Sequence, residues 1–276
     1  MNGFGSSGGA LSIVNAISSG FGGAFGIMLS TRAQVAPSED LSLTINGVPS
    51  DTRFLSCLLH QFNAAAELPG AAVSVTSSIP PCVGLKSSSA AGNAILLAFC
   101  NLLSIELTDE DILSMNAAAS IEAGVSVTGA YDDAAACLLG GAVLTDNAAM
   151  RILRRGEMPE TLQAFIVLPP QEDGVQLSTA FPRDRLNRDD SLAVFETAMT
   201  GDVMTAIRDN GKLVADALEI SNEIADAAMD AGAVTAGISG TGPAVGILVE
   251  DAQVPAFLNA FPYTPAITTR IRNRRL

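Results

Sequence analysis

The sequence predicts an α+β protein with two domains, and three observations support this prediction. Alternating apolar and polar residues at 71–79 predict a strand. A helical pattern with one apolar face follows at 87–103. The composition then changes between residues 146 and 159, where arginines and a glycine predict an exposed connection. We therefore expect a first domain at residues 1–150 and a second at residues 151–276.

Further elements are expected in both domains. In the first, a second helix should begin after Thr108, a good N-cap residue, and end near Gly124. In the second, a long helical pattern at 192–231 predicts two helices with a break near Gly211. Short apolar segments predict three strands in the second domain, at 164–168, 233–238 and 244–249.

The overall composition favours a globular enzyme. Of the 276 residues, 48% are apolar and 16% are charged, so a large core can form. The net charge of −14 disfavours binding to nucleic-acid phosphates. No apolar run reaches the roughly 18 residues of a membrane span, and the N-terminus lacks the pattern of a secretory signal. We therefore expect a cytoplasmic enzyme with neither a nucleic-acid nor a membrane partner. The sequence does not indicate the oligomeric state.

Several residues with reactive or charged side chains are expected to be structural or solvated. The four cysteines are scattered and should be buried thiols, and the single histidine, His60, lies in an apolar segment where it should pack. These features disfavour zinc sites and hydrolases that need a Ser-His or Cys-His pair. The arginines near the C-terminus are expected to form a solvated tail: Arg270, Arg272, Arg274 and Arg275.

The first 30 residues are rich in glycine. Gly3, Gly5 and Gly8 match the spacing of the dinucleotide fingerprint G-x-G-x-x-G. That fingerprint requires a strand before it, and only two residues precede Gly3. This disfavours a dinucleotide-binding oxidoreductase, and we expect these glycines to allow close backbone packing or substrate approach.

The segment between the predicted strand and the predicted helix has the composition of a phosphate-binding loop. Gly84 lets the backbone approach an anion, and Lys86, one of two lysines in the chain, supplies a positive charge. The serines at 87–89 leave the helix N-terminus open to an anion and add hydroxyls for phosphate or Mg²⁺. A serine-capped buried helix is the structural alternative. P-loop kinases are excluded, because no Gly-Lys-Ser or Gly-Lys-Thr occurs.

Three motifs resemble those of the GHMP kinases, the superfamily of galactokinase, homoserine kinase and mevalonate kinase. Their second motif is similar to the run Pro81-Cys82-Val83-Gly84-Leu85-Lys86-Ser87-Ser88-Ser89-Ala90. Their third motif resembles the run Gly237-Ile-Ser-Gly240-Thr241-Gly242-Pro-Ala, a glycine-rich turn between two predicted strands. Their first motif corresponds to the glycine-rich region that ends near Gly26. Because the motifs occur in the expected order, the resemblance extends over nearly the whole chain.

Within this superfamily, the motifs are most similar to those of the archaeal-type shikimate kinases. The phosphate loop of these enzymes carries a lysine and three serines, as at 86–89 here. Their acidic motif resembles the run Thr-Gly-Ala-Tyr-Asp-Asp-Ala at 128–134, and their N-terminal stretch resembles 13–17, which includes Asn15. Met28 stands where some relatives have an acidic residue.

The resemblance implies the two-domain GHMP kinase fold, with an N-terminal phosphate-binding α/β domain and a C-terminal ferredoxin-like α+β domain. It implies phosphorylation of the shikimate 3-hydroxyl by ATP, with Mg²⁺ as cofactor, in chorismate and aromatic amino-acid biosynthesis. The catalytic residues would be Asp132 as the base, with Asp133 as an open alternative, and Lys86. Ser88 and Glu122 would hold Mg²⁺. The second and third motifs would bind the ATP phosphates.

The substrate side of the site is less defined by the sequence. Asn15 is a candidate substrate ligand within the N-terminal stretch. Arginine binds a carboxylate such as that of shikimate through paired hydrogen bonds, which makes Arg183, Arg185 and Arg188 candidates. Two other functions remain open: a GHMP kinase for homoserine or mevalonate, and a non-catalytic nucleotide-binding module. Lys86 and the acidic motif disfavour the first, and the intact carboxylates disfavour the second.

Overall fold

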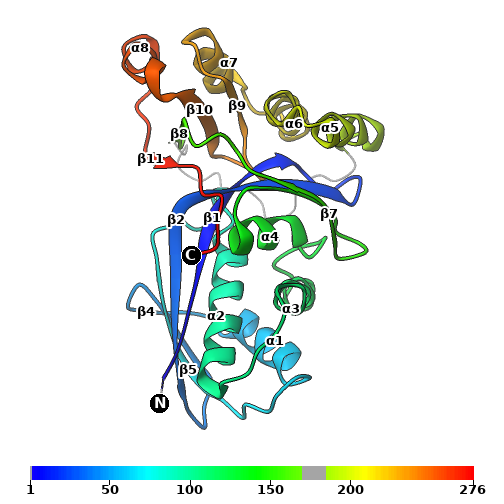
Figure 1. The fold of residues 1–276 in the computed structure, drawn as a ribbon, viewed down its shortest axis with the longest axis vertical. Coiled ribbons are helices and arrows are strands. Elements are labelled where there is room, and N and C mark those ends of the chain that lie inside the picture. Colours follow the sequence, from blue (N-terminus) through cyan, green and yellow to red (C-terminus); the bar gives the residue numbers. More distant parts are fainter. Residues whose placement is uncertain (1, 170–184) are drawn as a thin grey trace.

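The computed structural model describes residues 2–169 and 185–276, which form two sheets with helices packed against them (Figure 1). Within these residues the first sheet has seven strands in the order β4-β3-β5-β2-β6-β7, with β1 paired to β2. All its pairings are antiparallel except that of β3 with β5. The strands are β1 (Gly3–Val14), β2 (Phe21–Pro37), β3 (Ser42–Ile45), β4 (Val48–Pro49), β5 (Ala71–Ser77), β6 (Ala142–Asp146) and β7 (Arg151–Gly156).

Four helices lie together on one face of the first sheet (Figure 1). The central one, α2, packs against β1 and β2 and contacts the other three. Their bounds are α1 (Arg53–Phe62), α2 (Ser87–Leu103), α3 (Asp109–Glu122) and α4 (Tyr131–Leu139). Within this layer the N-terminal ends of α2 and α4 lie close together, because Lys86 before α2 pairs with Asp133 in the first turn of α4.

The second sheet has the order β11-β8-β10-β9 within the described residues. Its strands are β8 (Leu162–Val167), β9 (Thr235–Ile238), β10 (Val245–Glu250) and β11 (Ile267–Arg270). The second half also contains α5 (Arg188–Thr200), α6 (Val203–Leu218), α7 (Glu223–Asp230), the short 3₁₀ helix η2 (Asp251–Gln253) and α8 (Val254–Ala260). Helices α6, α7 and α8 pack against strands of this sheet. The expected mixture of α and β structure in both halves is confirmed.

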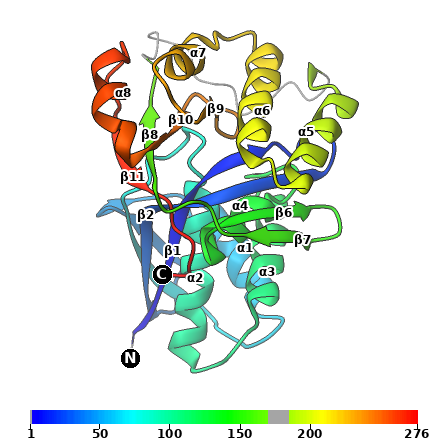
Figure 2. The same ribbon diagram turned by 45° about the horizontal axis from the view of Figure 1, so that its top comes forward.

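The two halves share a hydrophobic core. One buried cluster joins Leu11 of β1 to Ile207 of α6 and Leu248 of β10. The β6–β7 hairpin also lies below α5 (Figure 2), and Arg154 of β7 donates a hydrogen bond to the Met199 carbonyl of α5. Burial of this apolar surface favours one relative placement of the halves.

Most of the helices and strands expected from local patterns are confirmed. The strand expected at 71–79 is β5, and the helix expected at 87–103 is α2. Thr108 forms a full capping box with Asp111 at the start of α3, and Gly124, just beyond the end of α3, has φ +71°. The apolar segments of the second half are β8, β9 and β10.

Two expectations about the second half are wrong. The expected exposed connection is an edge strand, β7, because its backbone pairs with β6. The first sheet therefore extends to Gly156, and the division at residue 150 stays a prediction. The long helical pattern forms three helices rather than two, and Gly211 lies inside α6 instead of breaking it. A side chain at Gly211 would come within 2.6 Å of Gly237 in β9, so this glycine allows close helix–strand packing.

The N-terminal glycines belong to strand β1, and their expected role in close backbone packing is confirmed. A β-carbon at Gly3 would collide with the Ala98 carbonyl of α2, and one at Gly5 with the Ala94 carbonyl. The absence of side chains therefore lets α2 lie directly against β1.

Three expectations about exposure are wrong. His60 is exposed on α1, where it pairs with Glu122. Cys82 is exposed, although the other three cysteines are buried as expected. Arg272 is buried rather than part of a solvated tail, because the chain after β11 crosses back to the first sheet. Every helix among the described residues is too short or too polar to span a membrane.

Candidate active site

The phosphate-type loop leads into the N-terminus of α2. Cys82, Gly84 and Lys86 all have positive φ, so the backbone turns sharply three times before the helix begins. No side chain of the described residues caps this end of α2. Its first free N–H groups therefore face outward with the positive end of the helix dipole, which suits an anion.

The loop is held against the second half of the chain. The Val83 carbonyl accepts a hydrogen bond from the Ala244 amide at 3.1 Å, and the Gly84 carbonyl accepts one from Ser239 Oγ at 2.8 Å. A β-carbon at Gly84 would collide with the Ser239 carbonyl. Glycine at this position therefore lets the two glycine-rich segments come into contact.

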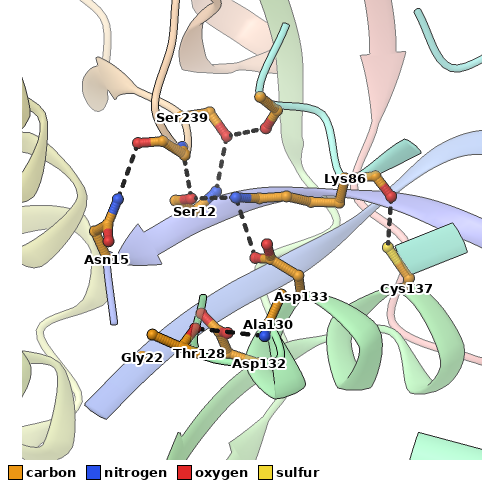
Figure 3. A network of polar contacts seen from close by, with 12 residues as sticks. Ser12, Asn15, Gly22, Lys86, Thr128, Ala130, Asp132, Asp133, Cys137 and Ser239 are labelled. Atoms are coloured by element: carbon orange, nitrogen blue, oxygen red, sulfur yellow. Dashed lines mark hydrogen bonds and ion pairs between the residues drawn. The ribbon is translucent and has the colours of Figure 1, made fainter. Parts of the chain in front are cut away.

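Ser12 of β1 links the two glycine-rich segments (Figure 3). Its hydroxyl oxygen accepts hydrogen bonds from Lys86 Nζ and from the Gly240 amide, each at 2.8 Å. The Ser12 amide donates to Ser239 Oγ at 3.1 Å. Because this serine is buried, its hydrogen bond holds the Lys86 ammonium group in one position.

Lys86 also pairs with the acidic motif. Its Nζ atom lies 3.0 Å from Asp133 Oδ1, and the side chains of Lys86 and Asp133 are only 6% and 19% exposed. Asp133 lies in the first turn of α4, next to Asp132. The acidic motif therefore begins a helix, whose dipole favours the negative charge of the two aspartates.

Asp132 is buried beneath Asp133. Asn147 holds it by donating from Nδ2 to Asp132 Oδ1 at 2.8 Å and by accepting from the Asp132 amide at 3.2 Å. Burial, and then the neighbouring Asp133 carboxylate, raise the pKa of Asp132 to about 7, although Lys86 opposes the shift. A side chain at Gly22 would collide with the Asp132 carboxylate, so the glycine leaves room for it.

The remaining residues of the loop before α2 differ in their exposure. Pro81 and Ser88 are exposed, Val83 and Ser87 are partly exposed, and Leu85, Ser89 and Ala90 are buried. Leu85 belongs to the hydrophobic core and so anchors the loop. In the glycine-rich turn, Gly240 lies beside Lys86, Thr241 is exposed and Gly242 is buried.

Asn15 lies at the junction of the two halves. Its Nδ2 donates to the Gly240 carbonyl at 3.1 Å and its amide donates to Asn210 Oδ1 at 2.8 Å. Its Oδ1 accepts from the Ile17 amide at 2.9 Å. Asn15 thus supports the turn that contains Gly240, and its role as a substrate ligand stays a prediction.

Glu122 and Ser88 do not contact each other. Asn116 of α3 donates to the Ser89 carbonyl at 2.9 Å, so α3 approaches the first turn of α2. The Glu122 carboxylate, however, accepts from Gln61 at 2.9 Å and lies 3.1 Å from His60 Nδ1. These hydrogen bonds lower the pKa of Glu122. No group of three or more acidic, histidine or cysteine side chains suited to a metal occurs among residues 2–169 and 185–276.

Two of the three candidate arginines for a substrate carboxylate lie among the described residues. Arg185 is exposed and pairs with Glu219 at 3.1 Å, and Arg188 is the exposed first residue of α5. Arg183 lies outside the described residues.

Sequence reasoning missed three residues that build the site: Ser12, Asn147 and Ser239. Ser239 belongs to the run that resembles the third motif, although no role was predicted for it. Ser12 and Asn147 meet their partners only through the folded sheet, because Ser12 lies on β1 and Asn147 follows β6. The contacts of these two residues span 74 and 15 positions of the chain, so no local pattern indicates them.

Comparison with known sequences agrees with the resemblance to the GHMP kinases. The family model for the GHMP kinases N terminal domain matches residues 52–141. The shikimate kinase of Methanothrix thermoacetophila is 38% identical over 255 residues, which cover 91% of this chain and 86% of the relative. The shikimate kinase of Methanosarcina mazei is 36% identical over 258 residues, covering 92% and 87%.

Comparison with solved structures shows the fold. The mevalonate kinase of Methanococcus jannaschii has a TM-score of 0.73 at 15% identity, covering 98% of both chains. The galactokinase of Lactococcus lactis in complex with galactose has a TM-score of 0.74 at 12% identity, covering 99% of this chain and 94% of the other. These likenesses confirm the two-domain α+β architecture that the motifs implied.

Proposed function

Because the chain belongs to the archaeal shikimate kinase family of the GHMP kinases, we propose that it transfers the γ-phosphoryl group of ATP to the 3-hydroxyl of shikimate. The observation that carries the proposal is the 3.0 Å pair between Lys86 at the start of α2 and Asp133 at the start of α4. This pair puts a cation suited to phosphate beside a carboxylate suited to a hydroxyl proton.

The loop before α2 binds the phosphates of ATP. The free N–H groups of the first turn and the positive end of the helix dipole attract the negative oxygens. Lys86, held by Ser12, adds a fixed positive charge. Because these donors are in place before the reaction, they stabilise the charge that develops on the transferred group without reorganisation.

Asp133 acts as the base in this proposal. The 3-hydroxyl oxygen forms a bond to the γ-phosphorus while the bond from that phosphorus to the β,γ-bridging oxygen breaks, and ADP leaves. The hydroxyl proton passes to the Asp133 carboxylate, so the products are ADP, shikimate 3-phosphate and a proton. We assign the base to Asp133 rather than Asp132 because Asp133 is partly exposed, whereas Asp132 is buried and bound to Asn147.

Asp132 supports that base. Its raised pKa of about 7 means that it readily holds a proton close to Asp133. A protonated Asp132 leaves Asp133 with one negative neighbour fewer, so Asp133 and Lys86 can form a simple ion pair.

Mg²⁺ fits the loop as a partner of ATP. Mg²⁺ bound to a nucleotide takes most of its ligands from phosphate oxygens and water, so one or two protein oxygens suffice. The exposed Ser88 hydroxyl is one such oxygen. Glu122 is the second candidate, and it would have to leave Gln61 and His60. The ion would neutralise charge on the β- and γ-phosphates.

The test is release of ADP from ATP and Mg²⁺ by the full chain, with shikimate, homoserine and mevalonate supplied separately. We expect turnover with shikimate alone. Turnover with homoserine or mevalonate instead would reject the proposed acceptor while keeping the phosphate site. No ADP release with any of the three would reject the proposed kinase activity on these acceptors and favour nucleotide binding without catalysis.

A further inference from the structure

The chain after β11 returns to the first sheet and runs beside α4. Ile271 forms a β-bridge with Ile27 of β2. The Arg272 amide donates to the Gly26 carbonyl at 2.9 Å, and the Arg272 carbonyl accepts from the Gly141 amide at 2.8 Å. These backbone contacts fix the position at which the Arg272 side chain enters the molecule.

The Arg272 guanidinium is buried, with the residue only 4% exposed. Its Nη2 atom donates to the Ala136 carbonyl at 2.8 Å and to the Cys137 carbonyl at 2.7 Å, and its Nη1 donates to the Arg274 carbonyl. Among the described residues, no carboxylate pairs with it and its Nε has no acceptor. Burying a charge with only these partners costs free energy. The contacts that the guanidinium makes are therefore expected to have a specific role.

Glycines make room for this side chain and its backbone. A β-carbon at Gly8 would collide with the Arg272 guanidinium. A β-carbon at Gly26 or at Gly140 would lie 2.7 Å from the Arg272 carbonyl oxygen. Three separate positions of the chain therefore lack a side chain where Arg272 passes.

The two carbonyls that Arg272 binds belong to the last turn of α4. The last carbonyls of a helix lack partners within the helix and lie at the negative end of its dipole, so a cation there stabilises the helix. The first turn of the same helix carries Asp132 and Asp133. The nine residues of α4 span only about 13 Å, so a shift at one end moves the other.

Helix α4 is therefore held at both ends. Lys86 and Asn147 hold its first turn through the two aspartates. Arg272 holds its last turn, and Ser7 Oγ also donates to the Cys137 carbonyl at 2.9 Å.

We propose that Arg272 is a positioning residue for phosphoryl transfer: it holds α4 by its carboxyl end and so keeps Asp133 at the correct distance from Lys86 and from the acceptor hydroxyl. This inference rests on the proposed function, because it concerns the placement of the proposed base.

The test compares Arg272→Gln with Arg270→Gln in the full chain. Glutamine at 272 keeps a side-chain amide donor but is shorter than arginine and has no charge. Arg270 lies two residues earlier and pairs with Asp251 at 2.7 Å on the surface, so its variant is a matched control. We expect Arg272→Gln to lower kcat by about tenfold or more, since small displacements of a base have large effects, with KM for ATP changed by less than about threefold. Arg270→Gln should leave both near their wild-type values.

The pH profile separates positioning from general loss of stability. The charged and titratable groups around the carboxylate pair are Lys86 from the start of α2, Cys137 from α4, and the two aspartates themselves. Arg272 binds the last turn of α4, so it acts on the pair through the position of the helix. A shift of α4 weakens the 3.0 Å pair between Lys86 and the α4 carboxylate, so the acidic limb of the kcat profile should move to higher pH. A folded Arg272→Gln variant with the kcat and acidic limb of Arg270→Gln would overturn the inference.

A second variant and an NMR measurement test the role of Arg272 if the first variant does not fold or the wild type is inactive. If Arg272→Gln does not fold, Gly8→Ala displaces the guanidinium while Arg272 stays in the chain, and it should give the same loss of kcat; an unchanged kcat would overturn the inference. If the wild-type chain does not turn over shikimate, the proposed function fails by itself. Carboxylate ¹³C NMR titration of Asp132 and Asp133 then tests the inference without turnover. Equal titration in wild type and the Arg272 variant would contradict it.

Discussion

The N-termini of α2 and α4 are built by the same backbone device but carry opposite chemistry. Each helix follows a residue with positive φ, Lys86 before α2 and Ala130 before α4, and neither has a side-chain cap among the described residues. The first turn of α2 contains serines and no acid, whereas that of α4 contains Asp132 and Asp133.

This difference determines what each helix end can do. The free N–H groups of α2 stay available for an external anion, and in a kinase this anion is a phosphate group of bound ATP. At α4 the same positive potential acts on the protein's own carboxylates. Where the ends meet, Lys86 and Asp133 join them, and in the proposed function this pair places the phosphate-binding cation beside the proton acceptor.

The largest expected effect comes from removing the charge of the base. Asp133→Asn should lower kcat by about 10² to 10⁴, because the hydroxyl proton loses its acceptor, while ATP binding stays near its wild-type level. Steady-state kinetics and nucleotide titration measure both. Near-normal turnover in Asp133→Asn, with a large loss in Asp132→Asn, would move the base to Asp132.

On the α2 side, Lys86→Met should act on nucleotide as well as on chemistry. We expect kcat/KM for ATP to fall by about 10- to 100-fold, since a fixed cation is lost beside the phosphates. The same kinetics with Lys212→Met provide a control, because Lys212 is the other lysine of the chain and lies on α6. Equal kinetics for the two variants would remove Lys86 from the phosphate site.

The burial of Asp132 should make the free energy of unfolding depend on pH. Its pKa is raised from 3.8 to about 7, so the folded protein keeps a proton that the unfolded chain loses as pH rises through this window. This stabilising contribution is present below about pH 4 and is lost by about pH 7. Asp132→Asn removes this titration. Between pH 5 and pH 8, the Tm of the variant should therefore fall by about 5 °C less than the Tm of the wild type. Parallel curves for the two proteins would contradict the raised pKa.

The smallest expected effect concerns Mg²⁺. Glu122→Gln should raise the Mg²⁺ concentration for half-maximal activity by about threefold or more, if the carboxylate turns from α1 to the ion. His60→Gln is the matched control, because it removes a partner of Glu122 and keeps the carboxylate. An unchanged Mg²⁺ requirement in Glu122→Gln would leave Glu122 as a contact between α3 and α1.

Short sequence patterns predicted those features that are determined by residues adjacent in the chain. The loop before α2 could be picked out as a candidate phosphate site because Gly84, Lys86 and the serines are adjacent, and α3 could be predicted because Thr108 begins a capping box with Asp111. The two acidic residues were found as a motif, although their helical conformation was not. Positive φ at Ala130 starts α4 without a cap residue, so no start signal was present.

The rest depends on contacts between distant residues. Arg272 looks like one of four solvated arginines, and only its path between Gly8 and α4 buries it. Gly211 looks like a helix breaker, but packing against Gly237 keeps it within α6. Ser12 has no distinguishing neighbours in the sequence, and its position on β1 makes it the link between the two glycine-rich segments.

The most direct test of the account is NMR analysis of the product formed by the full chain with ATP, Mg²⁺ and shikimate. We predict one new phosphate monoester, coupled in ³¹P–¹H spectra to the proton on carbon 3 of shikimate, in an amount equal to the ADP formed. Inorganic phosphate with unmodified shikimate, or an ester at another hydroxyl, would contradict transfer to the 3-hydroxyl at the site where α2 and α4 meet.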